Sequence, residues 1–182
     1  MTKKSYIQKA LLCAAMLCFT TACGSTPDSE PDNREAMIEE VSNLPDAKIK
    51  MPAVLAGDEL TDMPVDADNN ITYELDGETR TQILNELAAE IQTSIDTVLA
   101  DKEYYPNISD ITVNSDCTEF AIYLTTDEPN LYESTLMMSF YTVGDRYQIY
   151  NGVSAEDVKT TVIYKNAESG TELARTDSTS IR

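Results

Sequence analysis

Three oxygen-bearing side chains, Asp66, Asp68 and Asn70, occupy alternate positions of the chain. This spacing matches the first ligands of a calcium-binding EF-hand loop. Such a loop needs glycine at its sixth position and glutamate at its twelfth, where this chain has Ile71 and Gly77. We therefore expect a polar turn that leads into a strand. We predict no metal and no other cofactor, and keep these three side chains as the only candidate for a weak cation site.

Nucleophilic catalysis has little support in the sequence. The chain contains no histidine, which removes the usual general base and the commonest metal ligand. It also lacks the Gly-x-Ser-x-Gly and Ser-x-x-Lys motifs. Cys117 is the only cysteine among residues 49–182, which are predicted below to form the domain, and no histidine is present to activate it. We predict that Cys117 is an inert turn residue and that the protein is not an enzyme.

Paired carboxylates are the remaining route to catalysis, because the chain has 32 acidic residues. A glycosidase holds two carboxyl groups about 5 to 9 Å apart across a cleft. The acids of the first predicted helix, Glu86, Glu90, Asp96 and Asp101, are spread around its polar side, so their spacing selects no pair. A small carboxylate-dependent hydrolase of envelope or nutrient polymers stays open as an alternative function, as does a structural envelope component.

The net charge of −19 argues against a nucleic-acid partner. Nucleic-acid binding relies on lysine and arginine side chains that displace counterions from phosphates, and no basic groove is apparent in the sequence. The partners that remain compatible with this charge are cations, basic peptides and neutral ligands.

The second predicted helix, which ends near Tyr150, has apolar side chains on two sides. One stripe is sufficient to face a sheet, and it consists of Tyr132, Leu136, Phe140, Val143, Tyr147 and Tyr150. A second group lies away from this stripe and consists of Leu131, Met137, Met138, Tyr141 and Ile149. Either the first predicted helix or the predicted tether at residues 23–48 covers this group, or part of it binds a protein partner or a second copy. The leading prediction is therefore a binding or accessory module for a protein or ligand.

The first 23 residues have the three parts of a secretory signal. Lys3, Lys4 and Lys9 give a positive start without an acid, and an apolar run follows at residues 10–19. Ten apolar residues are too few for a transmembrane helix, which needs about 20. Small residues then precede Cys23.

This arrangement resembles a bacterial lipoprotein signal, in which a small residue is followed by the cysteine that receives the lipid. The resemblance covers residues 1–23 and implies cleavage between Ala22 and Cys23, with acylation of Cys23. The domain is then expected outside the cytoplasm, attached to the bacterial cell membrane by its lipid. Thr20 departs from the family pattern, which prefers leucine at that position. An ordinary secretory signal cleaved near Ala22 is the alternative.

A tether is predicted at residues 23–48, after a signal peptide at 1–22. Glycine, serine, threonine, proline and acidic residues give this segment the composition of a linker. Ile38, Val41 and Leu44 recur at helical spacing, together with Met37, and predict a short helix that docks on the domain or on a partner.

Residues 49–182 are predicted to form one α+β domain. Alternating apolar residues predict strands at 71–75, 111–113, 120–124, 158–164 and 171–177. Two helices separate them, the first with Thr79 and Gln82 in a predicted capping box. The order β-α-β-β-α-β-β begins as a ferredoxin-like fold and adds a strand. We expect a two-layer sandwich, with an antiparallel sheet and both helices on one face.

Overall fold

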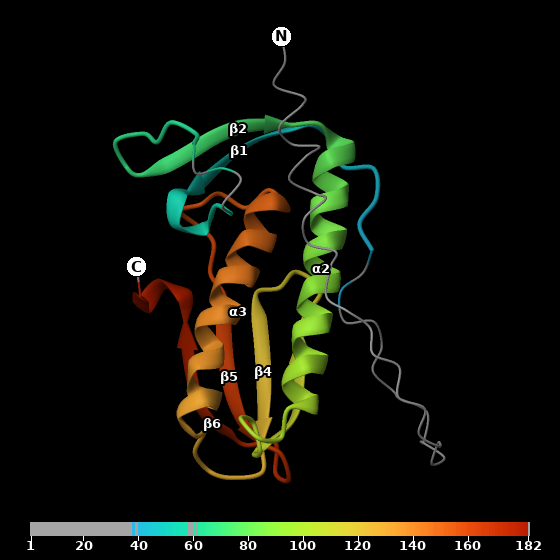
Figure 1. Ribbon diagram of the computed structural model, residues 1–182, viewed down its shortest axis with the longest axis vertical. Helices are drawn as coiled ribbons and strands as arrows, with labels where there is room; N and C mark the ends of the chain where they lie inside the picture. Colours follow the sequence, from blue (N-terminus) through green and yellow to red (C-terminus); the bar gives the residue numbers. More distant parts are fainter. Residues whose placement is uncertain (1–37, 39, 58–59, 61, 182) are drawn as a thin grey trace.

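The α+β class is confirmed by the computed structural model, which describes residues 38, 40–57, 60 and 62–181. Two helices and six strands follow one another in the order β-β-α-β-β-α-β-β (Figure 1). The elements are β1 (Ala47–Pro52), β2 (Asn70–Leu75), α2 (Gly77–Ala100), β3 (Ile108–Val113), β4 (Glu119–Leu124), α3 (Leu131–Tyr150), β5 (Thr161–Asn166) and β6 (Glu172–Asp177).

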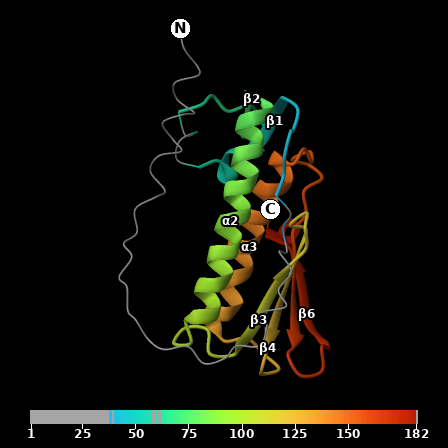
Figure 2. The same cartoon turned by 90° about the vertical axis from the view of Figure 1, so that its right-hand side faces the viewer.

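The main sheet has the strand order β3-β4-β5-β6, and both helices pack on one of its faces, as expected (Figure 2). It is mixed rather than wholly antiparallel, because β4 and β5 run parallel. The helix α3 forms the crossover that a parallel pair requires. The remaining pairs, β3 with β4 and β5 with β6, are antiparallel hairpins.

The strand β2 does not join this sheet, in contrast to the ferredoxin-like order. It pairs with β1 in a separate antiparallel hairpin, which crosses above the C-terminal end of α3 (Figure 1). The inward side chains Ile49 and Met51 of β1 are buried together with Ile71 and Leu75 of β2. The hairpin therefore covers one end of the helix layer with its apolar side chains.

The segment 40–46 lies against α2 without forming the short helix that its spacing predicts. The backbone of Val41 exchanges two hydrogen bonds with the side chain of Asn85, of 2.9 and 3.0 Å. The carbonyl oxygen of Leu44 approaches Gly77 so closely that a Cβ atom there would lie 1.8 Å away. This part of the predicted tether is therefore docked on the domain. The predicted short helix does not form at residues 40–46, where the backbone of Val41 pairs with the Asn85 side chain of α2 instead.

The helix α2 begins one residue after Asp76, whose side chain accepts a hydrogen bond from the backbone N–H of Thr79. The predicted capping box, with Thr79 as the cap, is therefore wrong, since Thr79 already lies within the first turn. The central residues of the predicted apolar stripe are buried, as expected. They are Leu84, Leu87, Ile91, Ile95 and Val98.

The helix α3 begins with a capping box. The Asn130 side chain accepts from the backbone N–H of Glu133, and the Glu133 carboxylate accepts from that of Asn130. Glu133 also accepts from the backbone N–H of Asn107 and is fully buried, so its charge is held by hydrogen bonds at a helix N-terminus. The helix ends before Asn151 and Gly152, as predicted, with Gly152 at φ +103°.

Candidate functional site

The predicted partner surface on α3 is divided between the interior and the solvent. Leu131 is 76% exposed and Met138 is 45% exposed, while Met137 is half-buried against the core. Tyr141 and Ile149 are each 2% exposed. Two of the five predicted residues are therefore exposed. Of the other three, Tyr141 and Ile149 lie in the core, and Met137 packs against it.

Tyr141 and Ile149 are buried for different reasons, both of which depend on distant parts of the chain. The Tyr141 hydroxyl lies 2.8 Å from the Thr176 hydroxyl, to which it donates, so its ring faces the sheet near β6. Ile149 lies near the end of α3 and lines a hollow with Ile49 of the β1–β2 hairpin. Neither residue belongs to a binding surface, because the sheet and the hairpin cover them.

The solvent side of α3 has no acidic side chain. Its exposed residues are Leu131, Tyr132, Thr135, Met138, Ser139 and Thr142, and we call them the α3 outer face. The three charged residues of the helix are Glu133 and Asp145, which are buried, and Arg146, which is partly buried. None of these six exposed residues is an acid, although the chain has 32 acids.

An aromatic pair extends the α3 outer face beyond the start of the helix. Tyr132 was predicted to face the sheet but is 53% exposed. Its ring packs edge-on against Tyr104, with 5.0 Å between the ring centroids. Tyr104 is also exposed, so these two rings and Leu131 form an apolar cluster at one end of the face. Exposed aromatic and methionine side chains are enriched at protein interfaces.

A groove between α2 and α3 borders the same face. Its volume is about 390 Å³, and α2 lines it with Glu90, Ile91 and Ser94. The lining residues from α3 are Ser139, Phe140, Thr142, Val143 and Arg146. The buried Nε atom of Arg146 has no hydrogen-bond partner. The sequence did not point to this groove, because its two walls come from residues about 50 positions apart.

A second hollow of about 430 Å³ lies between β1 and the loop after α3. Two of its basic side chains, Arg80 and Lys50, have partners within the domain. Arg80 donates from Nε to the carbonyl oxygen of Tyr150 over 2.6 Å, which caps the C-terminal end of α3. Lys50 forms an ion pair of 3.5 Å with Asp66. Arg80 therefore joins α2 to the end of α3, and Lys50 joins β1 to the turn before β2.

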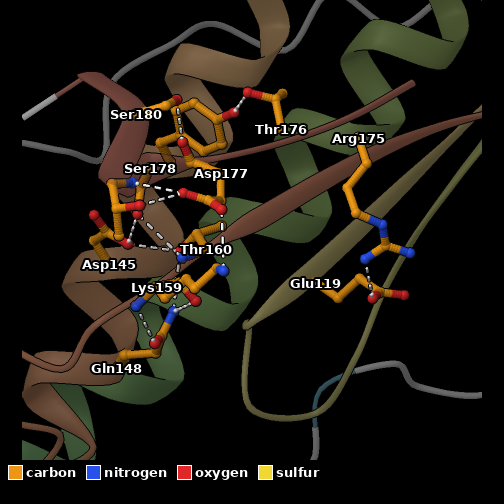
Figure 3. Close-up of polar contacts among 12 residues, drawn as sticks. Glu119, Asp145, Gln148, Lys159, Thr160, Arg175, Thr176, Asp177, Ser178 and Ser180 are labelled. Carbon is orange, nitrogen blue, oxygen red and sulfur yellow. Dashed lines mark hydrogen bonds and ion pairs between the residues drawn. The ribbon is translucent and has the colours of Figure 1, made fainter.

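A buried polar network behind α3 brings serine, threonine and aspartate together (Figure 3). The hydroxyls of Thr160 and Ser178 both donate to Asp145, at 2.8 and 3.0 Å. The amide of Gln148 donates to the Thr160 hydroxyl and to the carbonyl oxygen of Cys117. All of these side chains are buried, so no substrate reaches the Ser178 hydroxyl. The network fastens α3 to β5 and to the chain end.

The close approach of α3 to this network requires Gly144. A Cβ atom at this position would lie 2.5 Å from the Thr160 hydroxyl oxygen and 2.8 Å from the Cys117 carbonyl oxygen. Cys117 is fully buried in the β3–β4 turn, and burial, followed by the nearby Asp116 charge, raises its thiol pKa to about 12. A buried thiol with a raised pKa is consistent with the prediction that Cys117 is inert.

The Asp66–Asn70 segment is a tight polar turn, as expected. The Asp66 carboxylate accepts from the backbone N–H groups of Asp68 and Asn70, at 3.0 and 2.8 Å. The bond from Asn70 is the main cause of a lowered Asp66 pKa. In the part of the chain that the structure describes, no cluster of three or more potential metal-ligating side chains occurs.

Comparison of the chain with protein-family models, with curated proteins and with solved structures found no match in any of the three. None of the helices among residues 38–181, as far as these are described, has the length and hydropathy needed to cross a bilayer. The predicted signal, including Ala22 and Cys23, lies outside the described residues.

Proposed function

We propose that this chain is a lipid-anchored extracytoplasmic module that binds a partner protein through the α3 outer face. The observation that carries the proposal is the absence of acidic side chains from that face, on a chain with a net charge of −19. Solvation alone gives no reason to exclude acids from one exposed helix side. Contact with a partner does, because an unpaired buried carboxylate is costly.

The composition of the α3 outer face also fits an interface. An apolar cluster of Leu131, Tyr132 and Tyr104 lies at one end, and Met138 lies at its centre. The hydroxyls of Thr135, Ser139 and Thr142 flank Met138, and such side chains bury at low cost when a partner supplies a hydrogen bond. Interfaces commonly combine an apolar centre with a polar rim in this way.

The cellular location of the protein is the second part of the proposal. Acylation of Cys23 would attach the chain to the membrane, and the cleavage before Cys23 would remove three lysines and no acid, taking the charge from −19 to −22. A charge of this sign keeps the domain itself away from anionic lipid headgroups. The lipid then supplies the attachment, and the α3 outer face remains available above the membrane surface.

Site-specific photo-crosslinking in intact cells tests this proposal. A photoreactive amino acid at Met138 should give a discrete crosslinked species, while the same group at Thr93, exposed on α2, should not. Mass spectrometry of the detergent-extracted protein should show an acylated Cys23 at its N-terminus. Equal crosslinking at both positions, or none at Met138, contradicts the binding proposal, and an unmodified Cys23 contradicts the anchor.

A further inference from the structure

The hairpin of β1 and β2 leaves one edge of β1 without a backbone partner. Its strands are antiparallel, so backbone hydrogen bonds join the two strands only at alternate residues. Just beyond β1, the backbone N–H of Ala53 donates to the carbonyl oxygen of Asn69 over 2.9 Å. Counting back along the register from this pair, the odd-numbered residues of β1 bond to β2. The backbone N–H and C=O groups of Lys48 and Lys50 therefore point away from β2.

The outer edge of β2 is partly covered, whereas that of β1 is not. Residues 65–66 lie along β2, where the backbone N–H of Asp66 donates to the Asn70 carbonyl oxygen over 2.8 Å. Among the described residues, no backbone group bonds to the outward N–H and C=O groups of Lys48 and Lys50. An open strand edge of this kind is a template for pairing with another chain.

The hollow of about 430 Å³ lies along this open edge rather than along β2. From the hairpin strands it is lined by residues 47–50 and Pro52 of β1, but only by Asn70 of β2. The opposite wall is the loop at residues 152–156, which follows α3. A strand added to a sheet lies about 4.8 Å from its neighbour. An extended peptide in this hollow would therefore lie against the free backbone groups of Lys48 and Lys50.

The charged side chains of the hollow indicate the chemistry of such a peptide. The basic lining residues are Lys48, Lys50 and Arg80, and the acidic one is Glu156. The whole chain has the opposite balance, with 32 acids and 13 bases. Lys48 has no ion pair among the described residues, and the pair between Lys50 and Asp66 joins two half-exposed groups. Solvent ions screen the more distant acids, so this local excess of bases favours acidic side chains.

The alternation of side chains along β1 sets the pattern of the peptide. Lys48 and Lys50 are exposed on one face of the hairpin, and Ile49 between them is buried on the other. Residues of an added strand that lie opposite the two lysines share their face, where opposite charges attract. The residues between them lie on the inner face and are expected to be apolar. Val153 and Ala155 give the hollow apolar lining on its loop side.

We propose that the free edge of β1 binds an extended acidic peptide segment of a partner protein by strand addition. Its acidic side chains pair with Lys48 and Lys50, and its backbone forms a third strand beside β1. A second copy of this chain is a poorer occupant, because pairing of two β1 edges brings their lysines together. This surface is separate from the α3 outer face, so the two proposals can fail separately.

Fluorescence anisotropy with the detergent-solubilised full-length chain tests the proposal. The probe is the labelled peptide Thr-Val-Glu-Val-Glu-Val-Thr, and its matched control has lysine in place of both glutamates. We expect a Kd on the order of 100 μM or tighter for the acidic peptide, and binding at least about tenfold weaker for the basic one.

Backbone methylation of the acidic peptide separates strand addition from simple charge attraction. N-methylation of the two glutamates removes the N–H groups that would face β1, and should weaken binding at least about tenfold. N-methylation of two valines removes N–H groups that would face away from β1, and should change the Kd much less.

Substitutions assign the two lysines. Lys48→Gln combined with Lys50→Gln should weaken binding of the acidic peptide at least about tenfold, while Lys165→Gln on β5, outside the lining, should not. Lys48→Glu combined with Lys50→Glu should reverse the preference in favour of the basic peptide. Met138→Lys lies on the α3 outer face and should bind the acidic peptide as the unaltered chain does.

Three results would overturn the proposal. They are no binding of the acidic peptide, equal binding of the acidic and basic peptides, and equal effects of the two N-methylated series. The peptide comparisons use the unaltered chain, so they decide the matter even where a substitution impairs folding. Peptide binding without a Met138 crosslink leaves the β1 assignment intact and removes the partner of the α3 outer face.

Discussion

The two helices lie side by side on the same face of the sheet, yet they present different surfaces to solvent (Figure 2). The exposed side of α2 carries Glu78, Glu86, Glu90 and Asp96. The exposed side of α3 carries no charged residue, and its apolar and hydroxyl side chains form the α3 outer face. On a strongly acidic protein, an exposed helix that lacks acids is the more informative of the two.

The same comparison separates two sides of α3 itself. Its inner side contains buried rings and a buried polar network, among them Tyr141 and Asp145. Its outer side contributes little to folding, since Leu131 and Met138 are exposed. Substitutions on the two sides should therefore differ greatly in their effect on stability.

The largest effect is expected at Tyr141. Replacement by lysine would place an unpaired charge between α3 and the sheet, and should lower the free energy of unfolding by about 4 kcal/mol or more. Tyr141→Phe removes only the hydroxyl bond to Thr176 and should cost about 1 kcal/mol. Urea denaturation followed by circular dichroism measures both. A lysine variant as stable as the parent would mean that this side of α3 does not face the sheet.

A smaller effect is expected from alkaline pH, which acts on buried thiol and phenol groups of the interior. The folded state raises the thiol pKa of Cys117 from 9.0 to about 12, so only the unfolded chain ionises there between those values. The unfolded state then binds fewer protons, and stability is lost as pH rises above about 9, by at most about 1.4 kcal/mol per pH unit from this group. Burial raises the pKa of Tyr164 to about 12 and adds to the loss in the same direction.

Urea denaturation at pH 8 and pH 10.5 checks this dependence. Cys117→Ala should show a weaker loss between the two, because it removes one of the groups that ionise on unfolding. Equal stability of the parent chain at both values would contradict the assignment of these groups to the interior.

The smallest effect is expected at Met138. Met138→Lys should change the free energy of unfolding by no more than about 0.5 kcal/mol, as Thr93→Lys on α2 should, because both side chains are exposed. Only the first should remove the proposed partner from a pull-down made with the full-length protein. Loss of the partner with both variants would show that added positive charge, rather than the α3 outer face, is responsible.

The strands and helices of the domain could largely be predicted, because each has a clear local pattern. The alternation of Ile71, Tyr73 and Leu75 defined β2, and the stripe from Leu84 to Val98 defined α2. The strand β1 was missed, since Lys48, Lys50 and Pro52 give it a polar appearance and the segment before it resembles a linker. Its inward residues Ile49 and Met51 were the available indication.

The candidate site was predictable only in part, because burial depends on contacts between distant segments. The sequence left open whether the second apolar group of α3 is covered or partly accessible, and Leu131 and Met138 are its exposed members. The burial of Ile149 could not be predicted, since the covering hairpin was unknown, nor could that of Tyr141, since the pairing of β5 with β6 places Thr176 beside it. The burial of the Arg146 Nε atom without a hydrogen-bond partner could not be predicted either, because it depends on contacts between distant segments.

The two hydrogen bonds between Val41 and Asn85, here called the Val41–Asn85 clasp, are the first described contacts that a mechanical pull from the N-terminal side would meet. A pull applied from the N-terminal side of residue 40 meets the two hydrogen bonds of this clasp before it reaches β1. Behind the clasp, the force would be carried by the β1–β2 hairpin and by Arg80 at the end of α3. The four strands of the main sheet form a separate sheet beyond the hairpin, so such a pull would act on the hairpin before it reaches that sheet.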